Sequence, residues 1–247
     1  WNTIPLADIA NRMLSLGKTA LGCPIEIEFA VNMQKNKNPE FCLLQIKPMV
    51  LTGLKSIQTI ATDVGVFCKS HVTLGDGKID QIHDLIVVRP DSFNPAKTPD
   101  IAKEVDKMNQ NFGLKENYIL SGPGRWGSAD PWLGIPVRWQ QISQAKVIIE
   151  VGRTDMPVDP SFGSHFFQNI TSLHVAYFTI DPRRRKDLLD MDWLSQDNLV
   201  QSGKFVDWYR FDQPFLATLD GTTGKGLIFR PELEEPEIMD EEESSGI

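Results

Sequence analysis

Cysteine, histidine and long apolar runs are scarce in this chain of 247 residues. No two of its three cysteines form a C-x-x-C pair, which argues against a disulfide framework or a zinc cage. The four histidines likewise lack metal-ligand spacing. No apolar run approaches the roughly 20 residues that span a bilayer, and the start lacks the blocks of a signal peptide. We therefore expect a cytoplasmic protein with reduced cysteines and no membrane partner.

Positive charge is also in short supply. The chain has 25 lysines and arginines against 33 acidic residues, which gives a net charge of −8. The segment from Glu232 to Glu243 holds enough acidic residues to leave the rest of the chain nearly neutral. Such a run is typical of a disordered, solvating tail, so residues 232–247 are predicted to form one. A nucleic-acid partner is not expected.

The first run with strand-like alternation, PIEIEFAV, occupies residues 24–31. Because successive side chains of a strand point to opposite faces, Glu26 and Glu28 share one face. The other face carries Ile25, Ile27, Phe29 and Val31. The pattern predicts a strand with one acidic face and one apolar face.

A second run, FCLLQIKP at residues 41–48, alternates in the same way and places Gln45 and Lys47 on one face. The opposite face is predicted to carry Cys42, Leu44 and Ile46. If the two runs pair as a hairpin, two carboxylates, an amide and an ammonium gather on one surface. Carboxylate and amide oxygens suit Mg2+, and a nearby lysine neutralises phosphate oxygens. A metal–nucleotide site is one interpretation, and a solvent-facing amphipathic hairpin is the other.

Both runs resemble the end of the ATP-binding domain in the phosphoenolpyruvate synthase and pyruvate phosphate dikinase family, which has an ATP-grasp fold. In that family a strand of the form D-I-E-F or D-I-E-W precedes a strand that ends Q-x-R-P. The counterparts here are EIEF at residues 26–29 and QIKP at residues 45–48. The resemblance implies ATP and Mg2+ as cofactors. It assigns Glu28 and Gln45 to the Mg-ATP site, as the metal ligands. Glu26, which shares their face by strand alternation, is also predicted to bind the cofactor.

The same resemblance makes Lys47 the expected catalytic residue, because the family has a phosphate-facing arginine at this position. Lysine keeps the charge but lacks the planar fork of arginine. The resemblance covers residues 1–48, and motifs of the family's glycine-rich loop, phosphohistidine domain and pyruvate-binding barrel are absent after Pro48. We expect the C-terminal part of a longer phosphotransferase, inactive by itself, whose upstream domains complete the site.

A helix is expected before the hairpin. The residues that recur at helical spacing are Leu6, Ile9, Ala10, Met13 and Leu14. They predict a helix from about Pro5 to Leu16, with Gly17 and Gly22 in the following turn. We expect residues 1–52 to be the end of an ATP-grasp-like domain. Residues 53–231 are expected to form a second domain, with a weaker sub-boundary near Gly113.

The second domain is predicted to be mixed α/β. Its strand-like runs are VGVFCKS, DLIVV, YIL, AKVIIEV, LHVAYFTI, FVDWYRF and GLIF. A helix is predicted from Thr98 and Pro99 to Gly113, with an apolar stripe that should face the core. RRRKDLLDMDWL, from Arg183, suggests another helix, capped by Asp181. Its four cations favour a nearby anion, and a solvated helix start is the alternative.

The loop at residues 121–139, SGPGRWGSADPWLGIPVRW, combines glycines, arginines and tryptophans. Glycines let backbone amides turn toward an anion, and an arginine can close over it. The residues of this predicted anion site are Gly122, Gly124, Arg125, Gly127 and Ser128. The alternative is a packing role, with Trp126, Trp132 and Trp139 covering a core edge.

A third candidate is DPSFGSHFFQNITS at residues 159–172, where Ser164 can cap a short helix that begins with His165. His165 is an acid–base or phosphate-binding candidate, and a hydrogen-bonded structural histidine is the alternative. We expect Arg125 and His165 to approach one concave surface that binds a small phosphorylated metabolite. This stretch and the glycine–tryptophan loop also resemble a C-terminal extension of some synthase-like proteins.

Two functions therefore compete. In the first, the chain belongs to an ATP-dependent phosphotransferase. In the second, residues 53–231 form a non-catalytic ligand-sensing or interaction module and the hairpin is vestigial.

Overall fold

The computed structural model describes residues 4–21, 25–33, 38–48, 65–113, 116–153, 170 and 173–231. The chain divides into two compact units, unit 1 (residues 1–53) and unit 2 (residues 54–247), and each is described by itself. Helices and strands occur in both units, so the predicted mixed α and β fold class is confirmed. Within the described ranges, no helix is both long enough and apolar enough to cross a membrane.

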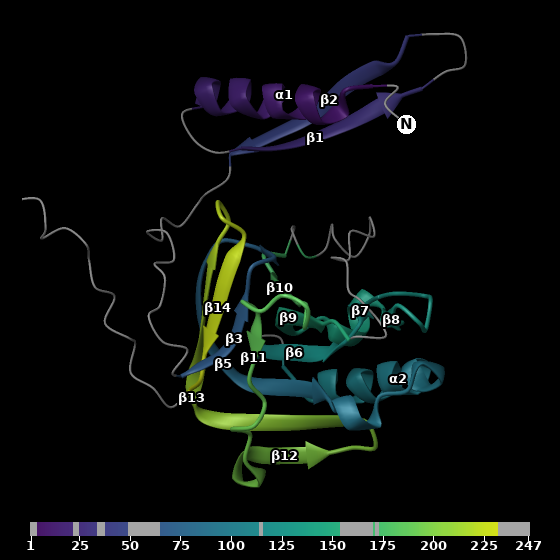
Figure 1. The fold of residues 1–247 in the computed structure, drawn as a ribbon, viewed down its shortest axis with the longest axis vertical. Helices are drawn as coiled ribbons and strands as arrows, with labels where there is room; N and C mark the ends of the chain where they lie inside the picture. Colours follow the sequence, from purple (N-terminus) through teal and green to yellow (C-terminus); the bar gives the residue numbers. More distant parts are fainter. Residues whose placement is uncertain are drawn as a thin grey trace, which may run out of the picture. The chain divides into compact units, whose positions relative to one another are not determined.

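Unit 1 is a helix followed by a hairpin (Figure 1). Its elements are α1 (Leu6–Leu21), β1 (Ile25–Asn32) and β2 (Glu40–Pro48). The prediction that α1 ends at Leu16 is wrong, because the helix continues through Gly17 to Leu21. Gly17 is buried, and the side chain of Ile25 occupies the space that a Cβ would need.

Unit 2 is built on one mixed sheet, to which ten strands of the described residues belong. The strand order is β11-β3-β14-β13-β5-β6-β9-β10-β4, and β12 pairs with β13. The strands are β3 (Val66–Ser70), β4 (Thr73–Leu74), β5 (Gly77–Val88), β6 (Tyr118–Pro123), β9 (Ala145–Val151), β10 (Ala176–Ile180), β11 (Leu188–Leu189), β12 (Leu199–Ser202), β13 (Val206–Asp220) and β14 (Lys225–Phe229). A separate small pair consists of β7 (Arg125–Trp126) and β8 (Gly134–Ile135).

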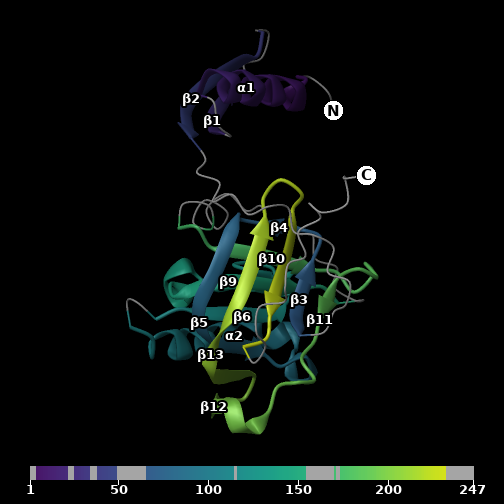
Figure 2. The ribbon, with the colours of Figure 1, turned by 90° about the vertical axis from the view of Figure 1, so that its left-hand side faces the viewer.

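Four neighbouring strands of this sheet, β5, β6, β9 and β10, run parallel. The helix α2 (Thr98–Asn109) lies between β5 and β6 in the chain. The long strand β13 pairs antiparallel with β5, and the sheet is curled rather than flat (Figure 2). Short 3-10 helices occupy Pro90–Ser92, Pro95–Lys97, Trp139–Ile142 and Gln196–Asn198.

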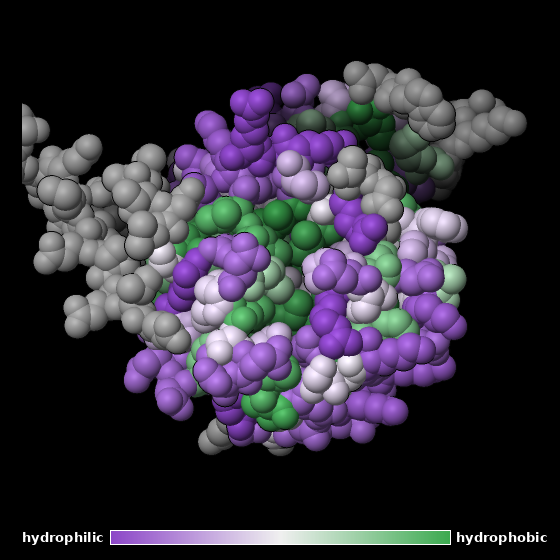
Figure 3. Space-filling view, turned by 60° about the horizontal axis from the view of Figure 1, so that its bottom comes forward, coloured by the Kyte–Doolittle hydropathy of each residue, from purple (hydrophilic) through white to green (hydrophobic). Residues whose placement is uncertain are grey.

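Apolar side chains form a core on each side of the sheet. The core on the α2 side includes Ile101, Val105, Met108, Tyr118 and Ile148. The core on the other side includes Phe67, Leu85, Ile119, Val147 and Phe215. Figure 3 shows a face on which hydrophilic side chains surround a smaller group of hydrophobic ones.

The apolar patterns predicted most of these elements. Each of the seven strand-like runs contributes a strand, and α2 begins at the predicted Thr98. The predicted stripe is buried, although α2 ends at Asn109, before Gly113. β5 and β13 are longer than their predicted runs, because each continues through polar residues.

The helix predicted from Arg183 is wrong. The chain there makes two tight turns, in which Arg184 donates its N–H to the Asp181 carbonyl and Asp187 donates to the Arg184 carbonyl. It then forms β11, which pairs with β3. The Asp181 carboxylate accepts the Arg183 N–H at 3.0 Å, a local side-chain bond that competes with helix formation.

Candidate functional site

The polar face of the β1–β2 hairpin forms as predicted. Glu28 lies directly opposite Gln45, and Glu26 lies directly opposite Lys47, in an antiparallel pair. Directly opposed residues project to the same face, with Cβ atoms roughly 5 Å apart. All four residues are exposed. One exposed surface therefore carries two carboxylates, an amide and an ammonium.

A β-bulge changes the faces of β2 beyond Gln45. Phe29 pairs with Leu43, so Leu44 is the extra residue of the bulge. Cys42 consequently lies opposite Ala30, on the side of the glutamates. The prediction that grouped Cys42 with Leu44 and Ile46 is wrong, because one extra residue reverses the alternation.

The opposite face of the hairpin is apolar. The rings of Phe29 and Phe41 stack with their centroids 4.7 Å apart, and Ile25 is buried. Leu43 and Ile46 remain 40% and 42% exposed. The apolar face of the hairpin packs against α1, where Ile25 and Ile46 lie beside Gly17. The glutamates are therefore on the face that points away from α1 and toward solvent.

The polar face has the donor types that Mg2+ prefers. The Glu28 carboxylate and the Gln45 amide oxygen supply two oxygen ligands, and Mg2+ ordinarily completes its octahedron with waters and nucleotide phosphates. Lys47 lies two residues from Gln45, about 7 Å along the strand. Its ammonium can reach a phosphate held by such a metal. These side chains are of the types that can bind Mg2+ and a phosphate group.

The glycine–tryptophan loop, in contrast, uses its backbone donors internally. Gly124 and Gly127, which flank β7, have φ values of 76° and 82°. The N–H groups of residues 124–127 donate to the Val151 carbonyl, the Leu133 carbonyl, the Glu150 carboxylate and the Ile135 carbonyl, at 2.8–2.9 Å. These four amides are occupied, so the predicted backbone nest for an anion does not form. The Ser128 hydroxyl is also used locally, since it donates to the Asp130 carbonyl at 3.1 Å.

The tryptophans of this loop have different roles. Trp126 is 1% exposed and lies over Gly122, where a Cβ would come within 2.7 Å of its ring. Trp139 packs at the edge of the core on the α2 side. Trp132 is 73% exposed, so the packing interpretation is correct for two of the three tryptophans. Gly122 serves close packing here.

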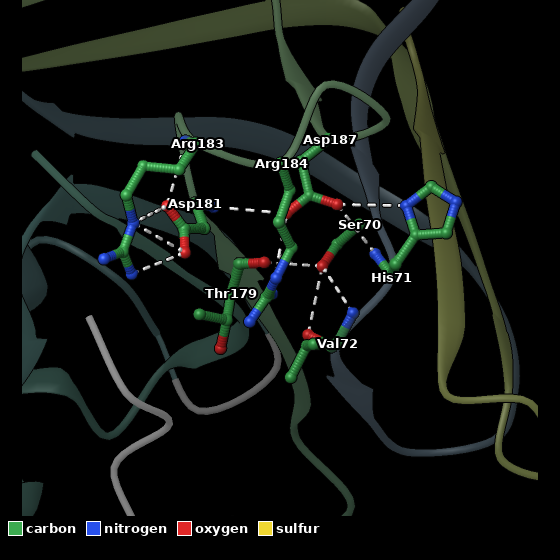
Figure 4. A network of polar contacts seen from close by, with 8 residues as sticks. All are labelled: Ser70, His71, Val72, Thr179, Asp181, Arg183, Arg184 and Asp187. Atoms are coloured by element: carbon green, nitrogen blue, oxygen red, sulfur yellow. Dashed lines mark hydrogen bonds and ion pairs between the residues drawn. The ribbon is translucent and has the colours of Figure 1, made fainter. Parts of the chain in front are cut away.

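The basic stretch after β10 is held by two buried aspartates (Figure 4). Asp181 accepts hydrogen bonds from Nε and Nη2 of Arg183 at 2.9 and 2.8 Å, and chiefly these bonds lower the pKa of Asp181 to about 2. Asp187 lies 3.7 Å from Nη1 of Arg184. Two of the cations in the stretch therefore have protein carboxylates beside them.

Asp187 also makes a contact that sequence reasoning missed. Its fully buried side chain accepts the His71 N–H at 3.1 Å and lies 3.0 Å from His71 Nδ1. Figure 4 shows the imidazole directed away from Arg184. The two residues are 116 positions apart, and no local motif links them.

Ser164 and His165 lie outside the described residues. The expected shared surface of Arg125 and His165 therefore stays a prediction. Arg125 is half-buried in β7, directly before Trp126.

The chain is thus a mixed α and β protein with a cluster of metal- and phosphate-compatible side chains on its N-terminal hairpin. Comparisons with known protein families, curated proteins and solved structures found no match.

Proposed function

We propose that unit 1 contributes metal and phosphate ligands to the Mg-ATP site of a phosphotransferase that resembles phosphoenolpyruvate synthase. The observation that carries this proposal is the register of β1 and β2, which sets Glu28 opposite Gln45 and Glu26 opposite Lys47. Glu28 and Gln45 bind the metal, and Lys47 contacts the transferred phosphate. Upstream domains of a longer chain supply the rest of the site.

The chemistry required of these residues is positioning and charge neutralisation, which dominate catalysis of phosphoryl transfer. Mg2+, when bound, neutralises charge on the phosphate oxygens. Lys47 adds a point charge beside it, and Glu26 lies opposite Lys47 on β1. The two-stranded scaffold keeps the Cβ atoms of opposed residues about 5 Å apart.

Binding of Mg-ATP to the 247-residue chain tests the proposal by calorimetry. A partial ligand set should give a Kd on the order of 1 mM, about −4 kcal/mol, without hydrolysis. Mn2+ in place of Mg2+ should broaden the amide NMR signals of Glu28 and Gln45 before others.

Glu28→Gln should weaken binding by about tenfold, because it removes the anionic metal ligand. Glu40→Gln is the matched control, since it removes the same charge from the same hairpin, opposite Asn32. If the hairpin is vestigial, the two variants should bind Mg-ATP with equal affinity and Mn2+ should not broaden the amide signal of Gln45. That result would refute the proposal.

A further inference from the structure

The apolar surface that unit 1 leaves uncovered is concentrated on β2. Most of the large hydrophobic side chains that are exposed within the described residues belong to unit 1, although it is the smaller unit. Leu43, Leu44 and Ile46 on β2 are 40%, 60% and 42% exposed. On β1, in contrast, Ile25 is buried and the other large apolar side chains are half-buried. β2 is therefore the less covered strand of the hairpin.

The outer edge of β2 is also open. Among the described residues the sheet of unit 1 consists of β1 and β2, so the backbone groups on one side of β2 have no strand beside them. Such an edge is a template for a strand of another chain. A sheet of three or more strands is also more stable than an isolated hairpin. An open edge flanked by exposed leucines indicates an interaction surface.

The bulge gives β2 faces that are symmetric about its middle. Before the bulge the polar face carries Glu40 and Cys42, and after it the same face carries Gln45 and Lys47. In a regular strand, residues separated by an odd number of positions lie on opposite faces. The extra residue Leu44 is what places Glu40 and Lys47 on one face. Reversing the direction of β2 therefore keeps its polar face polar and its apolar face apolar.

We propose that β2 pairs antiparallel with β2 of a second copy of this chain. A two-fold axis perpendicular to the sheet passes between Leu43 and Leu44 and sets Glu40 of each copy opposite Lys47 of the other. Opposite charges directly across two strands attract, so the dimer gains two such pairs. The Glu40 carboxylate accepts a hydrogen bond from the neutral amide of Asn32 at 3.3 Å, which leaves its charge available to Lys47. A shift of register by one residue would set polar side chains against apolar ones.

The apolar side chains support the same alignment. Phe41 of each copy lies opposite Ile46 of the other, and Leu43 lies opposite Leu44, so the exposed apolar surfaces of the two copies meet. A bulge ordinarily protects an edge from pairing. Here the bulges of the two copies meet at the axis, and the strand on either side keeps a regular alternation. The product is a four-stranded sheet, built from the self-complementary surface that a two-fold symmetric dimer requires.

Dimer formation does not depend on Mg-ATP, so this proposal can hold or fail independently of the proposed function. Sedimentation velocity of the 247-residue chain without nucleotide tests it over a range of concentrations. We expect an equilibrium between monomer and dimer. A chain that stays monomeric at every concentration would overturn the proposal and leave β2 to a different partner, such as a segment upstream in a longer chain.

Two matched substitutions test the apolar contact. Leu44→Asp should raise the dissociation constant of the dimer about hundredfold, because the axis brings two new carboxylates into the apolar contact. Val200→Asp is the control, since Val200 is 50% exposed on the short strand β12 of unit 2. It should change the dissociation constant by less than about twofold. Equal effects of the two variants would contradict the assigned surface.

The charge pairs are tested in the same way. Glu40→Lys should raise the dissociation constant about tenfold, because lysines are then opposed at both ends of the contact. Asp192→Lys is its control, since it changes the charge by the same amount at an exposed position of unit 2. A dissociation constant that responds equally to both substitutions would contradict the charge pairs. A native-like circular dichroism spectrum of each variant verifies its folding.

A cross-link places the contact on β2. In the proposed dimer the two Cys42 residues lie within about 10 Å of each other, because Cys42 of one copy is opposite Gln45 of the other. A short bismaleimide should therefore link two copies of a Cys23→Ser variant, in which Cys42 is exposed and Cys68 is buried. Addition of Leu44→Asp should abolish the linked product. Absence of the cross-link in a solution that contains dimers would show that they use another surface, and that result would overturn the proposal.

Discussion

Replacement of Gly122 by alanine should destabilise unit 2 measurably. The added Cβ would lie 2.7 and 3.1 Å from Cζ2 and Cη2 of Trp126, and 3.1 Å from a methyl carbon of Val88. Favourable carbon contacts are about 3.5–4.0 Å. Trp126 cannot move aside cheaply, because its ring N–H bonds to the Ile149 carbonyl and its backbone N–H bonds to Glu150.

Overpacking of this kind costs about 2 kcal/mol. In a unit of this size, the midpoint of thermal unfolding should fall by about 6 °C. Urea unfolding followed by circular dichroism measures the free energy directly. Gly113→Ala is the matched control, since its Cβ would meet its nearest neighbour, the Glu116 carboxylate, at 3.5 Å.

A double-mutant cycle with Trp126→Phe identifies the cause. If the indole ring is the obstacle, Gly122→Ala should cost about 1 kcal/mol less in the Trp126→Phe background. A cost for Gly122→Ala that is below about 0.5 kcal/mol, or the same in both backgrounds, would refute the packing argument.

Two further predictions concern single side chains. The pKa of Asp181 is lowered from 3.8 to about 2, so this carboxylate stabilises the fold above pH 4 and loses that contribution as pH falls toward 2. Because Arg183 is 61% exposed and solvent screens the pair, wild type should lose about 1 kcal/mol more than Arg183→Gln over that range in urea unfolding, and equal losses would contradict the assignment. Thiol labelling of a Cys23→Ser variant should modify exposed Cys42 in the native state and buried Cys68 after unfolding, and rapid labelling of both would be inconsistent with the core.

Local sequence patterns were sufficient to predict an element when one of its faces is apolar and the other is polar. The alternation of β1 and β2 predicted that Glu28 and Gln45 share a face, and the apolar stripe predicted α2. The bulge at Leu44 was not predictable, because Leu43 and Leu44 are equally apolar and either can face α1. Similarly, the motif at residues 121–139 indicated glycine-dependent geometry and could not distinguish anion binding from close packing.

Contacts between distant residues set the remaining features. The Asp187 carboxylate accepts the backbone N–H groups of Asp181 and His71, and these bonds hold the turn after Asp181. No periodicity around residue 187 indicates the contact with His71. β13 continues beyond Phe211 because β14 pairs with its second half, from Leu216 to Asp220.

The order of strands in unit 2 has a consequence for how the protein is made. β3, the first strand of the sheet in the chain, lies between β11 and β14, and β14 is the last. The ribosome must therefore release residues 225–229 before β14 can pair with β3 or with the second half of β13. Closing a sheet across so many intervening residues is slow, since the loop entropy must be lost before the contacts form. Until residues 225–229 have left the ribosome, the edge of β3 that pairs with β14 lacks its partner and is open to association with other chains.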